Sequence, residues 1–225
     1  MKTSPLRASM GKEIDGYSIS YEKVTPTEHV YVYQGSGDTV IIGFDQTEGA
    51  IWPLSKDWWE NLKAWKKSFS VGTEEWKAHA GFVREYLSVR NFVLDTLHYL
   101  TGVTQVIVSG FSQGAALATL CFRDILHSFP LLKVHGYAYA SPRVESLFSS
   151  KEFEHKLKER KDCSFVRISW VGDAVTGVPP FIFNYRHVGN EIFIGGGDPP
   201  LFRLNGEVHN QDKYLEYIES NGVAA

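Results

Sequence analysis

The chain has 225 residues, of which 43% are hydrophobic and 22% are charged, and its net charge is −3. This composition is typical of a globular protein, excludes a disordered chain, and argues against a nucleic-acid-binding surface or a surface for anionic membranes. There is no run of eighteen apolar residues and no apolar leader within the first 21 residues, so we expect no transmembrane segment and an intracellular, cytoplasmic location.

The first half of the chain predicts a hairpin followed by two helices. Residues 28–44 hold two runs of alternating or apolar residues, separated by Gly35-Ser36-Gly37-Asp38, which is typical of a strand hairpin. Residues 55–67 and 82–100 carry apolar side chains at intervals of three and four, which predicts two amphipathic helices.

The second half alternates strand and helix patterns. Residues 103–109 are short, apolar and β-branched, as in a strand buried on both faces, and a helix of small residues is expected over residues 115–127. Residues 133–140 and 164–171 predict two further strands, with a charged helix over residues 151–161 between them. This alternation predicts one α/β domain over the whole chain, with a mainly parallel central sheet and helices on both faces.

A motif with a chemical meaning joins the buried strand to the small-residue helix. Gly110-Phe111-Ser112-Gln113-Gly114 places a serine at a sharp strand-to-helix turn, where its hydroxyl is exposed and the first N–H groups of the helix point toward the reacting atoms. The flanking glycines are expected because the backbone segments of such a turn approach closely. The motif indicates that Ser112 is a nucleophile.

An activated serine needs a base and a carboxylate, and in α/β-hydrolases the chain order is serine, acid, histidine. His187 and His209 fit this order, and the choice between them stays open at this point. Asp173 is the favoured acid because it directly follows a predicted strand, and Asp198 is the weaker rival. We expect the remaining candidates, Asp124 and Asp162, to be solvated charges.

Eight segments, spread over residues 38–217, resemble the fungal-type class 3 lipases of the α/β-hydrolase superfamily in the order of that family. They are residues 40–47, 55–62, 79–82, 110–118, 140–144, 172–180, 185–189 and 208–217. The resemblance implies that Ser112 is the nucleophile, Asp173 the acid and His209 the general base. It further implies an oxyanion hole formed by the backbone N–H of Gln113 and by donors from Thr47.

This sequence departs from the family pattern near the expected oxyanion hole. Asp45-Gln46 stands where the family has Arg-Gly, Phe111 stands in place of the usual histidine, and Gln113 replaces a hydrophobic residue. We expect the side chain of Gln113 to point toward the substrate.

Five of the six tryptophans fall between residues 52 and 76. The resemblance locates a lid or entrance in this part of the chain, and we interpret residues 48–60 as that segment. Ile51, Trp52 and Trp59 are expected to line the acyl entrance, and Phe111 is assigned to substrate contact.

The sequence therefore predicts a serine carboxylic ester hydrolase, in particular a lipase acting on acylglycerols through an acyl-enzyme, with transient contact at a lipid interface. A phospholipase A1 and an esterase for soluble esters are the alternatives within this class. A non-catalytic binding module with a hydrolase fold is the alternative outside it. The sequence has no metal-ligand motif and no phosphate loop, so we expect no cofactor.

Overall fold

The computed structural model describes residues 2–46, 66–71, 74–196 and 208–222. Its centre is a seven-stranded sheet in the order β1-β2-β3-β6-β7-β9-β11. β1, β2 and β3 pair antiparallel, and every later neighbouring pair is parallel. The bounds of these strands are β1 Tyr17–Val24, β2 Glu28–Gly35, β3 Thr39–Gln46, β6 Gln105–Phe111, β7 Lys133–Tyr139, β9 Ser164–Trp170 and β11 Asn190–Ile194.

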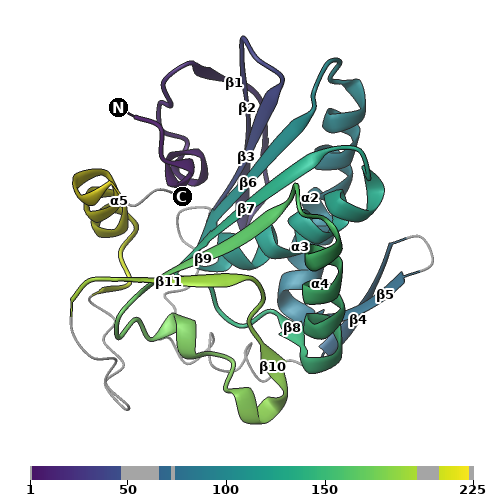
Figure 1. The fold of residues 1–225 in the computed structure, drawn as a ribbon, viewed down its shortest axis with the longest axis vertical. Coiled ribbons are helices and arrows are strands. Elements are labelled where there is room, and N and C mark those ends of the chain that lie inside the picture. The colour runs from purple at the N-terminus through teal and green to yellow at the C-terminus, as the bar shows by residue number, and fades with distance from the viewer. Residues whose placement is uncertain (1, 47–65, 72–73, 197–207, 223–225) are drawn as a thin grey trace.

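Helices cover both faces of this sheet (Figure 1). On one face lie α2 (Ala80–Tyr99), α3 (Gln113–Ser128) and α4 (Leu147–Glu159), and on the other lie the 3-10 helix η1 (Pro5–Met10) and α5 (Gln211–Asn221). β6 shows how the sequence dictates this layering, because Val106 and Val108 join the core beneath α2 and α3 while Ile107 packs on the opposite face. The expectation of a mainly parallel sheet between two helical layers is confirmed.

A second, four-stranded sheet lies beside α4 in the order β10-β8-β5-β4. Its strands are β4 Lys66–Val71, β5 Glu74–His79, β8 Glu145–Ser146 and β10 Tyr185–Arg186. The helix predicted over residues 55–67 is wrong at its end, because Lys66 and Lys67 pair antiparallel with β5. The rest of that helix lies outside the described residues. Short polar strands of this kind carry little periodicity for a sequence reading to detect.

The other predicted elements of the main sheet and its helices are confirmed within a few residues. One expected surface charge is not on the surface: Asp124 is fully buried and accepts hydrogen bonds from Arg90 (2.6 Å) and Tyr86 (2.8 Å). The prediction of a solvated carboxylate was wrong because helix periodicity marks apolar faces and cannot show that a distant cation will be held against an acid.

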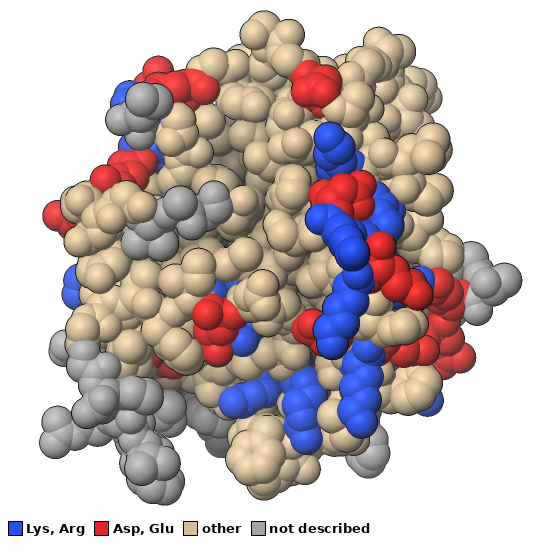
Figure 2. Space-filling view, viewed as in Figure 1, with Lys and Arg blue, Asp and Glu red and all other residues tan. Residues whose placement is uncertain are grey.

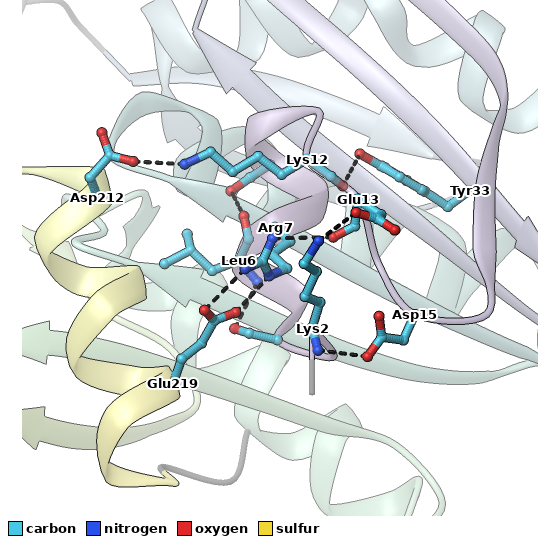
Figure 3. Close-up of polar contacts among 11 residues, drawn as sticks. Lys2, Leu6, Arg7, Lys12, Glu13, Asp15, Tyr33, Asp212 and Glu219 are labelled. Carbon is cyan, nitrogen blue, oxygen red and sulfur yellow. Dashed lines mark hydrogen bonds and ion pairs between the residues drawn. The ribbon is translucent and has the colours of Figure 1, made fainter.

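The N-terminal 3-10 helix is tied to the C-terminal helix by charged side chains (Figure 3). Arg7 of η1 donates to Glu219 of α5 over 2.6 and 3.0 Å, and Lys12 reaches Asp212 at the start of α5 over 2.7 Å. Below these pairs, Leu6 is buried together with Tyr214, Leu215 and Ile218. The two ends of the chain therefore cover the same face of the sheet.

Candidate active site

Ser112 occupies the junction of β6 and α3 in a backbone conformation that non-glycine residues rarely adopt, with φ 54° and ψ −119°. Its own N–H donates to the carbonyl of Tyr139 in β7 over 2.9 Å, which holds the turn to the neighbouring strand. The strain is local to the residue with the reactive hydroxyl, as expected of a nucleophile held at a sharp turn.

The two glycines of the motif are needed for close backbone contact. A Cβ atom on Gly110 would lie 2.1 Å from the carbonyl oxygen of Gly114, and one on Gly114 would lie 2.3 Å from the carbonyl oxygen of Phe44 in β3. The first turn of α3 thus packs directly against the ends of β6 and β3.

His209 lies immediately before α5 and faces Ser112 across the end of the sheet. Its Nε2 is 2.8 Å from the Ser112 hydroxyl, and its Nδ1 is 2.9 and 3.0 Å from the two carboxylate oxygens of Asp173. Because an ionised carboxylate only accepts hydrogen bonds, Nδ1 carries the proton toward Asp173 and Nε2 is left to accept the proton of the serine.

Asp173 follows β9 and is held by two further donors. The backbone N–H of Val175 donates to Oδ1 over 2.9 Å, and the hydroxyl of Tyr214 donates to Oδ2 over 2.8 Å. The Tyr214 hydroxyl accepts in turn from the backbone N–H of Trp170 over 2.6 Å. Each oxygen of the Asp173 carboxylate therefore accepts one hydrogen bond in addition to its contact with His209.

Tyr214 was not singled out for a role from the sequence, although it lies on α5 only five residues after His209. Burial and the neighbouring charge of Asp173 raise the pKa of Tyr214, so its hydroxyl keeps its proton and remains a donor. A tyrosine on the helix that follows a candidate histidine is a signal that sequence reasoning could have used.

The rival residues are not part of this arrangement. His187 Nε2 lies 2.8 Å from the carbonyl oxygen of Thr176, and burial together with the nearby Arg167 lowers its pKa to about 3. His187 is therefore neutral and structural. The rival acid Asp198 lies outside the described residues.

Gln113 begins α3, where the first backbone N–H groups of a helix have no acceptor within the helix. The sequence led us to expect that its side chain points toward the substrate, and this expectation is wrong. The side-chain amide instead donates hydrogen bonds to Glu28 (2.6 Å) and Glu85 (2.5 Å). Neither glutamate was singled out beforehand, because they lie 85 and 28 residues away in the chain. Thr47, the other expected oxyanion donor, lies outside the described residues.

Among the expected substrate contacts, only Phe111 can be described. Its ring packs against those of His209 and Tyr214, with centroid distances of 5.0 and 5.3 Å. Ile51, Trp52 and Trp59 lie outside the described residues, as does the whole segment 48–60. Of the five clustered tryptophans, Trp76 is described and is buried in the core beside Arg123.

Within the described parts of the chain, no helix has both the length and the apolar character needed to cross a membrane. In the same residues, no three His, Cys, Asp or Glu side chains gather in a way that could hold a metal ion.

Comparison with known proteins gives one family and several relatives. The family described as lipase (class 3) matches residues 53–183, a stretch that includes Ser112 and Asp173 and ends before His209. A secreted mono- and diacylglycerol lipase 1 from Fusarium solani is 25% identical over 147 residues, which cover 61% of this chain and 42% of that protein. A lipase from Rhizopus niveus is 30% identical over 142 residues, covering 60% of this chain and 35% of that protein. The chain thus spans less than half the length of these curated relatives.

Solved structures with the same fold are fungal lipases. Lipase II from Rhizopus niveus superposes with a TM-score of 0.66 at 22% identity, covering 84% of this chain and 72% of that one. The lipase from Rhizopus microsporus var. chinensis superposes with a TM-score of 0.64 at 23% identity, covering 82% and 63%. These likenesses show the α/β-hydrolase fold.

One expectation from the sequence is wrong. The intracellular, cytoplasmic location was inferred from the missing apolar leader, whereas the relative from Fusarium solani is named a secreted lipase. An unremarkable N-terminal composition was too weak a basis for assigning a compartment.

Proposed function

Because this chain belongs to the class 3 lipase family, we propose that it hydrolyses carboxylic esters of acylglycerols, with Ser112 as nucleophile, His209 as general base and Asp173 as its orienting acid. The observation that carries the proposal is the unbroken series of hydrogen bonds from the Ser112 hydroxyl through His209 to Asp173, with distances of 2.8, 2.9 and 3.0 Å. A strained serine at a strand–helix turn, hydrogen-bonded to a buried histidine–carboxylate pair, is the arrangement that activates a serine as a nucleophile.

In the proposed reaction, Nε2 of His209 takes the proton of Ser112 as Oγ attacks the ester carbonyl carbon. The bond to the leaving alcohol then breaks, and His209 gives this alcohol the proton it has taken. Water attacks the resulting acyl-enzyme in the same way, releases the fatty acid and restores the hydroxyl. Asp173 keeps the Nδ1–H of His209 in place and stabilises the imidazolium during each transfer.

The negative oxygen formed in each half-reaction needs donors, and we assign them to the backbone N–H of Gln113 and to Thr47. The position of Gln113 at the start of α3 supports this role, because the positive end of the helix dipole lies there. The assignment of Thr47 rests on the sequence resemblance.

The test uses hydrolysis of p-nitrophenyl butyrate and labelling by a fluorophosphonate probe. We expect Ser112→Ala to abolish both while its circular dichroism spectrum and urea unfolding match those of the wild type. Ser128→Ala, a change in the last residue of α3, is the matched control and should retain both activities. Hydrolysis of the ester that persists in Ser112→Ala would contradict the mechanism. A wild-type chain that neither hydrolyses the ester nor reacts with the probe would be a binding module.

A comparison of the rates on triacylglycerol, phospholipid and soluble esters then separates a lipase from a phospholipase A1 or an esterase.

We also propose that residues 1–225 form one domain in which residues 48–60 control entry to the site, with Ile51, Trp52, Trp59 and Phe111 contacting the acyl chain. The contacts between η1 and α5 support a single domain, because elements from both ends of the chain share one face of the sheet. The tryptophan-rich composition of the entrance segment favours hydrophobic esters.

Contact with a lipid surface is supported by four exposed apolar side chains between β8 and β10. Phe148, Phe181, Ile182 and Phe183 are 69%, 63%, 72% and 59% exposed, and we name them the apolar surface. The last three form the 3-10 helix η3 (Phe181–Phe183). A hydrogen bond from the backbone N–H of Leu147 to the carbonyl oxygen of Asn184 connects the end of η3 to the start of α4. Contiguous exposed aromatic residues of this kind usually mark an interaction site.

Two cations are fixed on the backbone of the apolar surface. Lys66 donates to the carbonyl of Phe183 over 2.8 Å, and Arg186 donates to the carbonyl of Phe181 over 2.9 Å. Lys and Arg side chains gather around β10 at the same end of the molecule (Figure 2). Apolar side chains flanked by fixed cations suit a lipid surface that contains anionic headgroups. This proposal departs from the expectation drawn from the net charge of −3, because a net charge does not show where cations gather locally.

The triple variant Phe181→Ser, Ile182→Ser, Phe183→Ser tests this contact. We expect it to lose binding to vesicles containing phosphatidylglycerol and to hydrolyse emulsified triacylglycerol several-fold more slowly, with unchanged turnover of p-nitrophenyl butyrate. Leu131→Ser is the matched control, because Leu131 is 93% exposed and precedes β7 at the opposite end of the sheet from Ser112. Equal vesicle binding by the triple variant and the wild type would contradict the contact.

A further inference from the structure

At the residue that follows the nucleophile, three elements meet at one side-chain amide. Gln113 of α3 donates from Nε2 to Oε1 of Glu28 at the start of β2 and to Oε2 of Glu85 on α2. Glu28 is fully buried, and the distances are 2.6 and 2.5 Å. The residue that carries the proposed oxyanion N–H is therefore held through its own side chain by two acids.

The charges around this amide do not balance unless one carboxyl carries a proton. Burial, which is the largest cause, and the charges of Glu85 on α2 and Asp45 on β3 together raise the pKa of Glu28 to about 9, against the lowering effect of the Gln113 hydrogen bond. Burial also raises the pKa of Glu85, and the charge of Arg84 on the same helix opposes this. The second oxygen of Glu28, Oε2, is buried and has no hydrogen-bond partner within the described residues. A neutral Glu28 therefore avoids an unpaired buried negative charge while its Oε1 accepts from Gln113.

The position of Gln113 gives this contact a consequence for catalysis. Its backbone N–H belongs to the peptide unit that joins it to Ser112, at the N-terminal end of α3, where no hydrogen bond within the helix fixes it. A side chain anchored to β2 and α2 limits rotation of that peptide unit. Gln113 stands where the family pattern noted above has a hydrophobic residue, and Asp45 stands where it has an arginine.

We propose that Glu28 and Glu85 are positioning residues for the oxyanion site, which hold the Gln113 amide, and through it the adjacent backbone N–H, while Glu28 keeps its proton. This inference rests on the proposed ester hydrolysis and adds a requirement to it. When Glu28 ionises, two carboxylates and the nearby Asp45 repel one another around the amide, and the anchor is lost.

The test measures kcat and KM for p-nitrophenyl butyrate between pH 6 and 10.5 in three variants. We expect Glu28→Ala to lower kcat about tenfold at pH 7 with KM nearly unchanged, a smaller loss than the 10²–10³-fold that follows removal of an oxyanion donor. Glu28→Gln is neutral and similar in shape, so it should restore most of kcat. It should also retain activity above the pH of about 9 at which the wild type declines. Glu22→Ala, on the neighbouring strand β1 and exposed, is the matched control.

A double variant checks that Glu28 acts through the amide. In a Gln113→Leu background the anchor is already absent, so adding Glu28→Gln should leave the alkaline limb of the profile unchanged. Urea unfolding of each variant separates a loss of positioning from a loss of folded protein.

The outcomes distinguish the two proposals. If the wild type turns over the ester but Glu28→Ala retains full kcat, or if the alkaline limb is the same in the wild type and in Glu28→Gln, the positioning role is overturned and the hydrolase assignment stands. If the wild type does not turn over the ester in a manner that depends on Ser112, both proposals fall together.

Discussion

Two buried carboxyl groups flank the candidate nucleophile, and their surroundings are opposite in kind. Within the described residues, the carboxylate of Asp173 is hydrogen-bonded to His209, Tyr214 and the backbone N–H of Val175. Glu28 meets a donor in Gln113 but also two other acids, Glu85 and Asp45. The first environment stabilises a negative charge next to a histidine that must become positive, whereas the second favours a neutral acid. The proposed mechanism uses the charge of the first carboxyl, and the proposed positioning role uses the proton of the second.

The largest expected effect comes from removing the charge of Asp173. Asp173→Asn keeps the size of the side chain but offers an amide to His209, which favours the wrong tautomer of the ring. We expect kcat for p-nitrophenyl butyrate to fall about 10³–10⁴-fold. Glu28→Gln is the same kind of substitution and should lower kcat little at pH 7. Similar losses in the two variants would remove the contrast between the two carboxyls.

The next effect concerns the hydroxyl that holds Asp173. Tyr214→Phe removes the donor to Asp173 and leaves the backbone N–H of Trp170 without its acceptor. We expect the free energy of unfolding to fall by about 2 kcal/mol and kcat to fall about tenfold. Urea unfolding and steady-state kinetics measure the two effects.

Tyr217→Phe is the matched control for this change. The ring of Tyr217 also packs against Trp170, with a centroid distance of 5.1 Å, and within the described residues its hydroxyl has no hydrogen bond in the structure. Tyr217→Phe should therefore leave the free energy of unfolding and kcat nearly unchanged. Equal effects of the two variants would assign the role of Tyr214 to its ring.

The surroundings of Asp173 and those of Glu28 could not be predicted equally well from the sequence. Ser112, Asp173 and His209 could be proposed because each follows a local signal, such as a buried strand, a turn or a family motif. The parallel strands could be predicted because their apolar runs are continuous. Glu28, Glu85 and the buried Asp124 were missed because their partners lie on other elements, and nothing in their own segments distinguishes a buried acid from a solvated one. The orientation of the Gln113 side chain depends on the same long-range contacts.

The most direct comparison of the two environments is the dependence of stability on pH. The pKa of Glu28 is about 9 in the folded chain and about 4.5, the ordinary value, in the unfolded chain. Between these values the folded state holds a proton that the unfolded state has lost, so the free energy of unfolding falls as the pH rises, by at most about 1.4 kcal/mol per pH unit from this group. Below pH 4.5 both states are protonated, and the contribution no longer changes.

Glu28→Gln removes this titration, so the variant should gain stability relative to the wild type as the pH is raised from 6 to 9. Urea unfolding at pH 6, 7.5 and 9 measures the difference, with Glu216→Gln, an exposed residue of α5, as the control. A difference between Glu28→Gln and the wild type that stays constant with pH would show that Glu28 is already ionised in the folded chain. The two carboxyls beside Ser112 would then be alike in charge, and the anchor of Gln113 would have to tolerate two negative neighbours.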